Sequence, residues 1–246
     1  MKLTNKNIIL LGEVESTNNY AMQLVSDKAK EGTVVLAQYQ SRGRGQAGRY
    51  WESGAEKNLL MSVILEPTFL EAGDQFYLSM IVSLALVRFL RKHISEVSIK
   101  WPNDIYVDER KIAGILIENS VKGSTLEKSV VGIGLNINQE LFTSDAPNPV
   151  SLKQLTGKEY LLAEILDEFL EDLEYWYQTL YLKDFATIRQ AYSSALFRKS
   201  GWYLYRAAGE EFLAQIVGVA EFGQLLLEDR SGKIRTYRFK EVEFVL

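Results

Sequence analysis

The sequence is poor in the residues that many enzymes use for catalysis. In 246 residues there is no cysteine and one histidine, His93. Disulfides, thiolate zinc sites and cysteine nucleophiles are therefore excluded, and a reducing compartment fits the composition. A single histidine gives little support to Ser–His catalysis or to a soft-metal site. We expect His93 to be a charge at a helix C-terminus or a surface group.

An excess of positive charge is also missing. The formal net charge is −4 and the sequence pI is about 5.3. A dedicated nucleic-acid binder usually has a strong basic excess, so DNA and RNA are not expected partners. Positive charge gathers instead in one short segment, at Arg42, Arg44 and Arg49. A basic loop in an acidic protein favours a small anionic ligand over a polyanion.

Long hydrophobic runs are absent as well. The longest apolar block, residues 80–90, is interrupted by Ser83 and Arg88. A membrane span needs about 20 apolar residues, and the run at residues 8–11 is too short for the core of a signal peptide. We therefore expect a cytoplasmic protein with no membrane partner.

Hydrophobic spacing predicts an α+β chain with a large first part and a small second part. Helices are expected at residues 17–26, 74–93, 160–180 and 184–196, where apolar residues recur at three and four positions. Strands are expected at residues 8–11, 33–40, 58–65, 97–101, 105–107, 112–117 and 129–137. From residue 201 onward, short strands separated by Gly209, Gly223 and Gly232 predict a small β-barrel. The predicted domains are residues 1–197 and 198–246.

The segment between residues 41 and 50 is rich in glycine and arginine. Gly43, Gly45 and Gly48 allow backbone N–H groups to point inward and bind an anion, and arginine adds forked donors for phosphate or carboxylate. The alternative is a flexible, solvated basic loop. A dinucleotide-binding loop is rejected, because a strand follows the glycines where that motif needs a helix.

Two further segments carry functional groups. In the run Lys100-Trp101-Pro102-Asn103-Asp104, an aspartate at the start of a strand can orient a donor or hold a metal, although Asn and Asp in such places usually form a turn. Lys111 lies on the second arm of a predicted hairpin. It either places one positive charge in a cleft or is a solvated charge at a strand edge.

Together these segments resemble the biotin–protein ligase family. The resemblance is close from about Glu13 to Asn138. It rests on five segments in family order: Glu15-Ser16-Thr17-Asn18, Gln40 with Gly43 to Trp51, Lys100 to Asp104, Lys111 to Glu118, and Gly132 to Asn138.

The resemblance implies a fold and a reaction. The fold is a mixed sheet flanked by helices, of the class II synthetase-like type, followed by an SH3-like barrel. Biotin and ATP, with Mg²⁺, form biotinyl-5′-AMP and diphosphate. The biotinyl group then passes to a lysine of a biotin carboxyl carrier domain of acetyl-CoA carboxylase or a related carboxylase.

The resemblance also implies residue roles. Catalysis falls to Lys111, Arg44, Arg49 and Asp104, of which Asp104 would orient or deprotonate the incoming lysine. The implied biotin contacts are Ser16, Thr17, Asn18, Gln40, Gly43, Arg44, Lys111 and Gly114. The implied contacts of ATP and the adenylate are Arg44, Arg49, Trp51, Asn103, Lys111 and Asn136. The glycine–arginine loop would close as a lid and keep water from the intermediate.

The chain departs from the family in two places. The family loop often has arginine where this chain has Gln46 and Ala47, which predicts weaker retention of the adenylate. The first motif begins at Glu15, so no N-terminal DNA-binding domain and no repressor role are expected. The metal ligands, the particular carrier and dimerisation are left open by the sequence.

Three rival functions remain: a lipoate or octanoyl ligase of related fold, a non-catalytic sensor of biotinyl-adenylate, and a module whose barrel binds RNA. A lipoate ligase would need a long apolar tunnel, and the run Ser16-Thr17-Asn18 with Gln40 favours biotin instead. The cations Arg44, Arg49 and Lys111 argue against a sensor, and the low pI argues against RNA.

Overall fold

The computed structural model describes residues 7–144 and 148–245. Its larger sheet contains seven strands. These are β1 (Asn7–Val14), β2 (Thr33–Gln40), β3 (Leu59–Leu65), β4 (Val97–Lys100), β5 (Asp104–Val107), β6 (Arg110–Lys122) and β7 (Thr125–Leu135). They lie in the order β1-β2-β3-β7-β6-β5-β4, with β1 and β2 parallel and the other neighbours antiparallel. The sheet is therefore mixed, as predicted.

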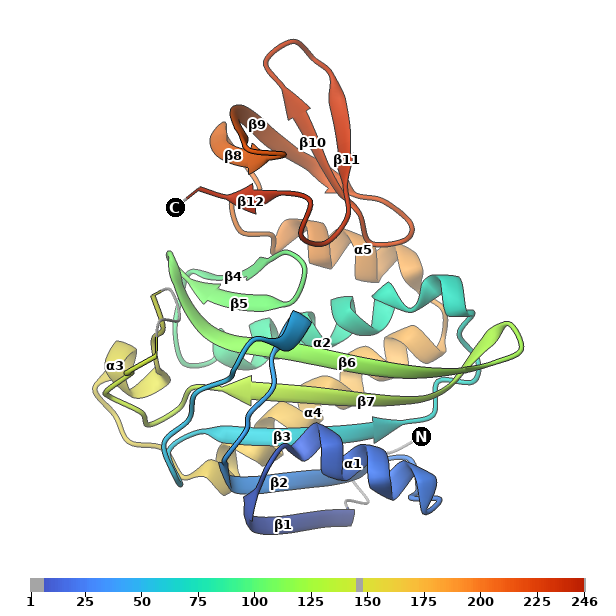
Figure 1. Cartoon of the computed structure of the whole chain (residues 1–246), viewed down its shortest axis with the longest axis vertical. Coiled ribbons are helices and arrows are strands. Elements are labelled where there is room, and N and C mark those ends of the chain that lie inside the picture. The colour runs from blue at the N-terminus through green and yellow to red at the C-terminus, as the bar shows by residue number, and fades with distance from the viewer. Residues whose placement is uncertain (1–6, 145–147, 246) are drawn as a thin grey trace.

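Helices cover both faces of this sheet, but unequally. The helices are α1 (Thr17–Ser26), α2 (Phe76–Leu90), α3 (Leu152–Thr156), α4 (Leu162–Tyr181) and α5 (Phe185–Ser194), with short 3-10 turns η1 (Gln46–Gly48) and η2 (Ala72–Asp74). Figure 1 shows α2 and α4 behind the sheet, α5 above them next to the C-terminal strands, and α1 and the η1 loop in front of the sheet. On this front side a narrow pocket is lined by the start of α1, the η1 loop, β6 and β7.

Helix α2 is the centre of the hydrophobic core. It is buried almost all round because it packs against α4, α5 and the strands β4, β5 and β6. With a mean hydropathy of 1.3, the stretch Ala72–Leu90 has the length and composition of a membrane span, contrary to the expectation from the interrupted apolar block at residues 80–90. In this fold 67% of that stretch is buried inside the protein, as the central helix of a packed core requires.

The C-terminal part forms a second, antiparallel sheet. Its strands are β8 (Tyr203–Ala207), β9 (Glu210–Val219), β10 (Leu225–Asp229), β11 (Ile234–Tyr237) and β12 (Glu243–Phe244), in the order β11-β10-β9-β8-β12. This confirms the predicted small barrel-like unit. The predicted domain boundary, between residues 197 and 198, falls in the connection between α5 and β8.

The segment after α5 joins the larger sheet. Leu196 bridges Ile99 of β4 in parallel, and the backbone N–H of Ile99 donates to Ala195 O at 2.7 Å. The prediction that this helix continues to residue 196 is therefore wrong, because the backbone from Ala195 onward pairs with β4. The barrel is thereby attached directly to the strand that precedes Asp104.

His93 lies in the turn after α2, but it is not an exposed surface group. Its side chain is 17% exposed, and Nε2 is 3.2 Å from Glu168 Oε2 on α4. The imidazole also packs against the rings of Phe89 and Tyr160. The histidine therefore links α2 to the elements behind the sheet, away from the open front face.

Candidate active site

A cluster of buried polar side chains lies where β2 ends and α1 begins. Ser16, Thr17, Asn18, Gln40 and Ser62 are each 6% exposed or less. Gln40 Oε1 accepts hydrogen bonds from the backbone N–H of Thr17 at 2.7 Å and from its hydroxyl at 3.1 Å. Ser62 Oγ lies 2.8 Å from Thr17 Oγ1 and 2.6 Å from Asn18 Oδ1. A buried polar network of this kind is held in one geometry by its own hydrogen bonds.

The start of α1 differs from the prediction in one respect. Ser16 is the N-cap residue, but its side chain makes no capping hydrogen bond. Gln40, from the neighbouring strand, accepts the free N–H of Thr17 instead. The hydroxyl of Ser16 consequently stays at the surface of the pocket, where it can bind a ligand.

Gly132 on β7 makes room for this cluster. A Cβ atom at Gly132 would lie 2.0 Å from Asn18 Oδ1, a distance that no side chain can tolerate. Asn18 Nδ2 in turn donates to Glu118 Oε2 at 2.9 Å and to Leu116 O at 3.2 Å on β6. Asn18 thus crosslinks α1 to the centre of the sheet.

The glycine–arginine loop has a defined conformation. Trp51 N donates to Gly43 O at 2.9 Å, and Arg44 pairs with Tyr50 in an antiparallel bridge around η1. A Cβ atom at Gly43 would lie 2.4 Å from Trp51 O, so this close return needs glycine. The segment therefore folds back on itself around η1.

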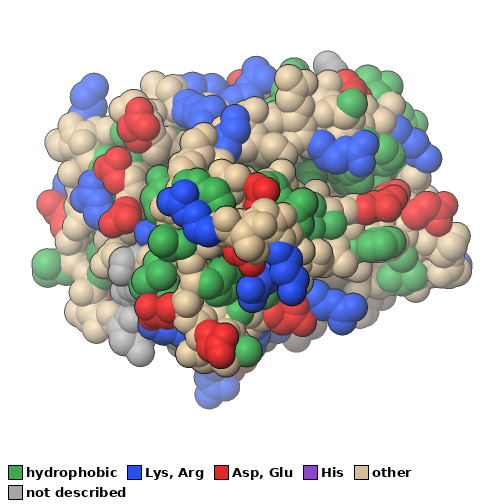
Figure 2. All heavy atoms as spheres, turned by 90° about the horizontal axis from the view of Figure 1, so that it is seen from above, with side chains coloured by type: hydrophobic (Ala, Val, Ile, Leu, Met, Phe, Trp, Pro, Cys, Tyr) green, Lys and Arg blue, Asp and Glu red, His purple; other side chains and the backbone are tan. Residues whose placement is uncertain are grey.

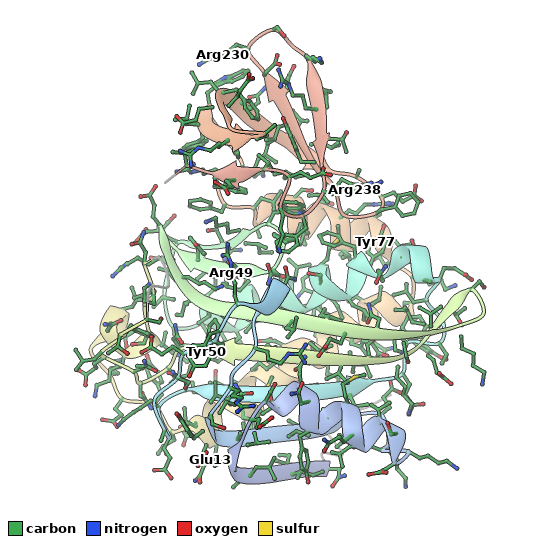
Figure 3. The ribbon with its side chains drawn as sticks, viewed as in Figure 1. Glu13, Arg49, Tyr50, Tyr77, Arg230 and Arg238 are labelled. Carbon is green, nitrogen blue, oxygen red and sulfur yellow. The ribbon has the colours of Figure 1, made fainter. Side chains whose placement is uncertain are left out.

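The arginines of the loop point in different directions. Arg44 Nη2 lies 3.0 Å from Glu118 Oε1, and Nη1 donates to Asn19, so Arg44 faces the cleft beside α1. Arg42 pairs with Glu15 at 3.3 Å in an exposed position. In Figure 3, Arg49 lies on the side of the loop nearer to β5, whereas Tyr50 lies on the opposite side.

The β5–β6 hairpin supplies a second cation. Lys111 Nζ is 2.7 Å from Asp104 Oδ1, and both side chains are about one quarter exposed, at 26% and 24%. Of the two interpretations of Lys111, the structure shows the lysine in a cleft. Asn103 has a structural contact, since its Nδ2 donates to Ile115 O at 2.7 Å and ties the turn to β6.

Trp51 lies over the glycines of β6 and β7. A Cβ atom would be 2.9 Å from the Trp51 ring at Gly114 and 2.3 Å from it at Gly134. Lys111 Nζ lies 5.5 Å from the centre of the ring. The indole therefore fills the groove between the polar cluster and Lys111, and the free pocket that remains is narrow, about 40 Å³.

Trp51 Nε1 and Asn136 Oδ1, like Gln46 Oε1 in the wall of the pocket, are buried polar atoms that lack partners among the described residues. Asn136 Nδ2 donates to Val150 O at 3.2 Å, so its amide is anchored with the oxygen left free. Unpaired buried polar atoms are costly, and a ligand that satisfies them gains affinity. A nucleotide base, which has both donors and acceptors, suits such a pair.

Lys100 lies beside this site on β4. Its Nζ donates to Tyr106 Oη at 3.1 Å and lies 4.6 Å from the centre of the Tyr106 ring and 5.5 Å from that of Phe244. The pKa of Lys100 falls to about 8, chiefly because of burial; the negative charge of Asp104 opposes this shift, and the positive charges of Lys111, Arg198 and Arg49 add to it. Burial likewise raises the pKa of Tyr106.

Most of the predicted site residues meet in one pocket. Those that line it are Ser16, Thr17, Asn18, Gln40, Arg44, Trp51, Asn103, Lys111 and Gly114. Asp104 contacts it through Lys111, Gly43 lies behind Trp51, and Asn136 and Arg49 lie outside its lining. No role was predicted for Ser62, Glu118, Gly132 or Gly134. The signal that could have found them is a small or polar residue inside an otherwise apolar strand, as in the run Leu59–Leu65 and in residues 130–135.

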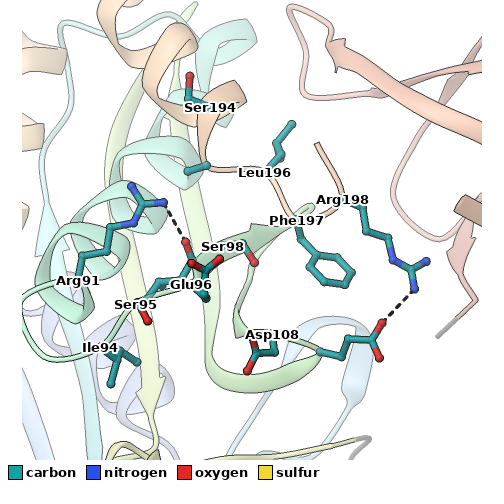
Figure 4. A pocket seen from close by; sticks show the side chains of 13 residues that line it. Arg91, Ile94, Ser95, Glu96, Ser98, Asp108, Ser194, Leu196, Phe197 and Arg198 are labelled. Atoms are coloured by element: carbon teal, nitrogen blue, oxygen red, sulfur yellow. Dashed lines mark hydrogen bonds and ion pairs between the residues drawn. The ribbon is translucent and has the colours of Figure 1, made fainter. Parts of the chain in front are cut away.

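Wider grooves exist elsewhere but lack comparable chemistry. Two open grooves of about 710 and 720 Å³ lie at the start of β4 and around the β5–β6 turn. In the first, Arg91 donates to Val97 O and Arg198 pairs with Glu109, so its cations are already partnered (Figure 4). The narrow pocket, not the wider grooves, contains the predicted residues, and it is therefore the candidate active site.

The described residues do not build a metal site of their own. Within residues 7–144 and 148–245, no group of three or more Asp, Glu, His or Cys side chains is placed to hold a metal ion. The magnesium implied by the resemblance has no fitting set of protein ligands among these residues.

The sequence matches the model of a known family. A family model described as the Biotin/lipoate A/B protein ligase family matches residues 11–136, which include α1, the glycine–arginine loop and the β5–β6 hairpin. The chain belongs to this family.

Three relatives illustrate how far the likeness extends. This family member is 28% identical to the bifunctional ligase/repressor BirA of Bacillus spizizenii, over 96% of this chain and 74% of the relative. It is 30% identical to a biotin–[acetyl-CoA-carboxylase] ligase of Paracoccus denitrificans, over 91% of this chain and 95% of the relative. Among solved structures, a biotin protein ligase of Aquifex aeolicus in complex with biotin and ATP superposes with a TM-score of 0.81. The two sequences are 27% identical, and the superposition covers 97% of this chain and 99% of the Aquifex aeolicus chain.

Proposed function

We propose that the narrow pocket performs both half-reactions of a biotin–protein ligase. The chain is an ATP-dependent biotin–[acetyl-CoA-carboxylase] ligase that forms biotinyl-5′-AMP and diphosphate and then biotinylates a carrier lysine. One observation carries this proposal: the cations Lys111 and Arg44 share a pocket with the buried hydroxyl and amide groups of Ser16, Thr17 and Gln40. The cluster suits the ureido ring of biotin, and the cations suit its carboxylate.

The first half-reaction brings two anions together. The biotin carboxylate attacks the α-phosphate of ATP, so their repulsion must be offset by positive charge already in place. Lys111 is held on a strand and Arg44 on a folded loop, and neither needs large rearrangement to face the ligand. Each must exchange a protein carboxylate, Asp104 or Glu118, for the substrate. The paired carboxylates keep the cations oriented in the absence of substrate.

Ligand entry requires the indole of Trp51 to move. The free pocket of about 40 Å³ is too small for biotin or ATP, because a single water molecule already needs about 10–15 Å³ of such space. Displacing Trp51 from Gly114 and Gly134 opens the groove between Lys111 and the polar cluster. Asn136 Oδ1 and Trp51 Nε1 would then find partners on the nucleotide.

In the second half-reaction a lysine of a biotin carboxyl carrier protein attacks the mixed anhydride and releases AMP. The acidic Asp104, freed from Lys111 once the adenylate occupies the site, would attract the incoming ammonium. The proposed activity is ligation alone, and it does not include the repressor role that the name of the Bacillus relative mentions.

The decisive experiment is a mass-shift assay with ATP, biotin and a biotin carrier domain. We expect the carrier to gain one biotinyl group and the reaction to release AMP and diphosphate. Competition between biotin and lipoate separates this ligase from a lipoate or octanoyl ligase. Diphosphate release without transfer to any carrier would contradict the second half-reaction, and absence of both would favour an adenylate sensor.

The barrel gives no support to the RNA-binding alternative. Figure 2 shows this end of the molecule with Lys and Arg side chains scattered among acidic, apolar and neutral ones. A nucleic-acid surface normally concentrates basic residues on one face.

A further inference from the structure

Lys100 has a surrounding that its place in the sequence motif does not explain. It lies directly opposite Asp104 in the β4–β5 register, and Ser98 lies opposite Tyr106 in the same register. Because side chains alternate between the faces of a strand, Lys100, Asp104 and Tyr106 share one face. Lys111 lies opposite Tyr106 on β6. The lysine is thus a neighbour of the Asp104–Lys111 pair.

Two domains enclose the amino group of Lys100. Tyr106 comes from the larger sheet, and Phe244 comes from β12 of the barrel. Arg198, in the connection between the domains, donates to Val245 O at 2.9 Å and so keeps β12 beside β4. Charged groups also face Lys100 from every element around it. They are Asp104 on β5, Lys111 on β6, Arg198 before β8 and Arg49 after η1.

This surrounding lowers the pKa of Lys100 and so increases the fraction of its side chain that is a neutral amine. Aromatic rings replace water around the amino group, and three cations oppose one carboxylate. The pKa of Lys100 falls to about 8, so a useful fraction of the side chain is a free base near neutral pH. The hydrogen bond to the Tyr106 hydroxyl holds the amine of Lys100 on the face of the sheet that also carries Asp104.

The transfer step needs such a base. A carrier lysine in water has a pKa of about 10.4 and must lose a proton before it can attack. A carboxylate, with an ordinary pKa of about 3.9, is a poor acceptor for that proton, whereas an amine of intermediate basicity is well matched.

Resting on the proposed ligase function, we infer that Lys100 accepts a proton from the carrier lysine, while Asp104 attracts and orients that carrier lysine. The carrier ammonium transfers one proton to the neutral amine of Lys100. The nitrogen of the carrier lysine then bonds to the acyl carbon of biotinyl-adenylate, and the bond from that carbon to the phosphate oxygen breaks. AMP leaves with the electron pair, and the second proton of the new amide nitrogen passes to water.

The test separates the two half-reactions. Enzyme loaded with biotinyl-adenylate is mixed with a carrier domain under single-turnover conditions from pH 6 to 10, and biotinylated carrier is measured by mass. Diphosphate release without carrier is measured in parallel. Lys100→Arg keeps the positive charge but cannot act as a base in this range, and Lys100→Met removes both properties.

We expect wild-type transfer to rise with pH and level off above pH 8. Both Lys100 variants should lose transfer by on the order of 100-fold near neutral pH and should rise without levelling off, while still forming adenylate. Phe244→Ala, which admits water to Lys100, should move the midpoint of the wild-type profile to higher pH. A purely structural role would not produce that displacement.

Other results would overturn the inference. Wild-type transfer and pH profile in Lys100→Arg would show that charge alone is needed. Loss of diphosphate release in Lys100→Met, restored in Lys100→Arg, would make Lys100 a phosphate-binding cation of the first half-reaction. Failure of the wild-type protein to form adenylate or to biotinylate carrier would instead refute the ligase function itself.

Discussion

Lys111 Nζ and Asp104 Oδ1 lie 2.7 Å apart across the β5–β6 hairpin, at the edge of the pocket that also contains Arg44. The pair joins the cation proposed for the first half-reaction to the carboxylate proposed for the second. If Lys111 exchanges Asp104 for the adenylate, as proposed, Asp104 becomes available to the carrier lysine in the second half-reaction.

The first prediction concerns Lys111. Lys111→Ala should lower adenylate formation by at least about 100-fold, because the charge that offsets the repulsion of two anions is lost. Diphosphate release on addition of biotin measures the effect, and thermal unfolding checks the fold. Lys122→Ala, at the exposed far end of the same strand, is the matched control and should behave like the wild type. Near-normal turnover in Lys111→Ala would contradict the assigned role.

The second prediction concerns Gly134 and Trp51. Gly134→Ala should displace the indole, because the added Cβ atom would lie 2.3 Å from Trp51 Cε2. The expected results are a changed tryptophan emission spectrum and weakened binding of ATP, because Gly134 lines the pocket and the added methyl group takes up space that the ligand would use. Gly12→Ala is the control, since its nearest contact is an ordinary 3.7 Å from Gln38 Oε1. Unchanged emission and unchanged ATP binding in Gly134→Ala would show that the indole is not seated on β7.

The third prediction concerns Ser62, whose hydroxyl forms hydrogen bonds with Thr17 Oγ1 and Asn18 Oδ1. Ser62→Ala should raise the KM for biotin by about tenfold, the equivalent of about 1.4 kcal/mol, since a buried hydrogen-bonding partner is removed. Steady-state kinetics with biotin as the varied substrate measure the change. Ser83 is equally buried but has no hydrogen-bond partner for its hydroxyl among the described residues. Ser83→Ala should therefore leave the KM for biotin unchanged.

The fourth prediction concerns retention of the intermediate. Gln46 lines the pocket, so Gln46→Arg should add a charge that holds the adenylate phosphate. Less free biotinyl-adenylate should then escape in the absence of carrier, as measured by chromatography of the filtrate. Gln38→Arg on the exposed surface of β2 controls for the change in net charge. Equal leakage from the wild type and Gln46→Arg would refute the idea.

The fifth prediction concerns pH and the loop after β7. Burial on its own would raise the pKa of Glu52, but hydrogen bonds from Ser144 and Thr143 outweigh it and lower the pKa to about 2. Because the folded value lies below the ordinary 4.5, the stabilisation is present above that pH and is lost as pH falls through about 2.

Amide exchange at Thr143 and Ser144 measures this anchoring. Glu52→Gln should speed exchange relative to the wild type at neutral pH. The difference should shrink between pH 4.5 and about 2, where the wild-type carboxylate itself becomes protonated. A difference that persisted unchanged at pH 2 would show that the charge of Glu52 does not anchor the loop.

Local sequence was sufficient for the type of most elements, although it did not predict the short helix α3. The three- and four-residue spacing of apolar side chains placed α2 and α4, and the glycines of residues 43–48 indicated a loop that could bind an anion. The ends of elements were less predictable. The helix ending at Ser194 stops there because the following backbone pairs with Ile99, a partner about 95 positions away. No local pattern contains that contact.

The sequence by itself determined that this chain has no thiol chemistry, a mixed sheet with a small barrel, and a set of biotin-ligase motifs in order. Only the tertiary structure decided that Lys100 faces the barrel while Asp104 faces Lys111, and that Ser62, Glu118 and Gly132 support the binding cluster. The physical reason is that side-chain periodicity specifies which face of a strand a residue occupies. What covers that face depends on strand order and domain packing, which bring together residues from distant parts of the chain.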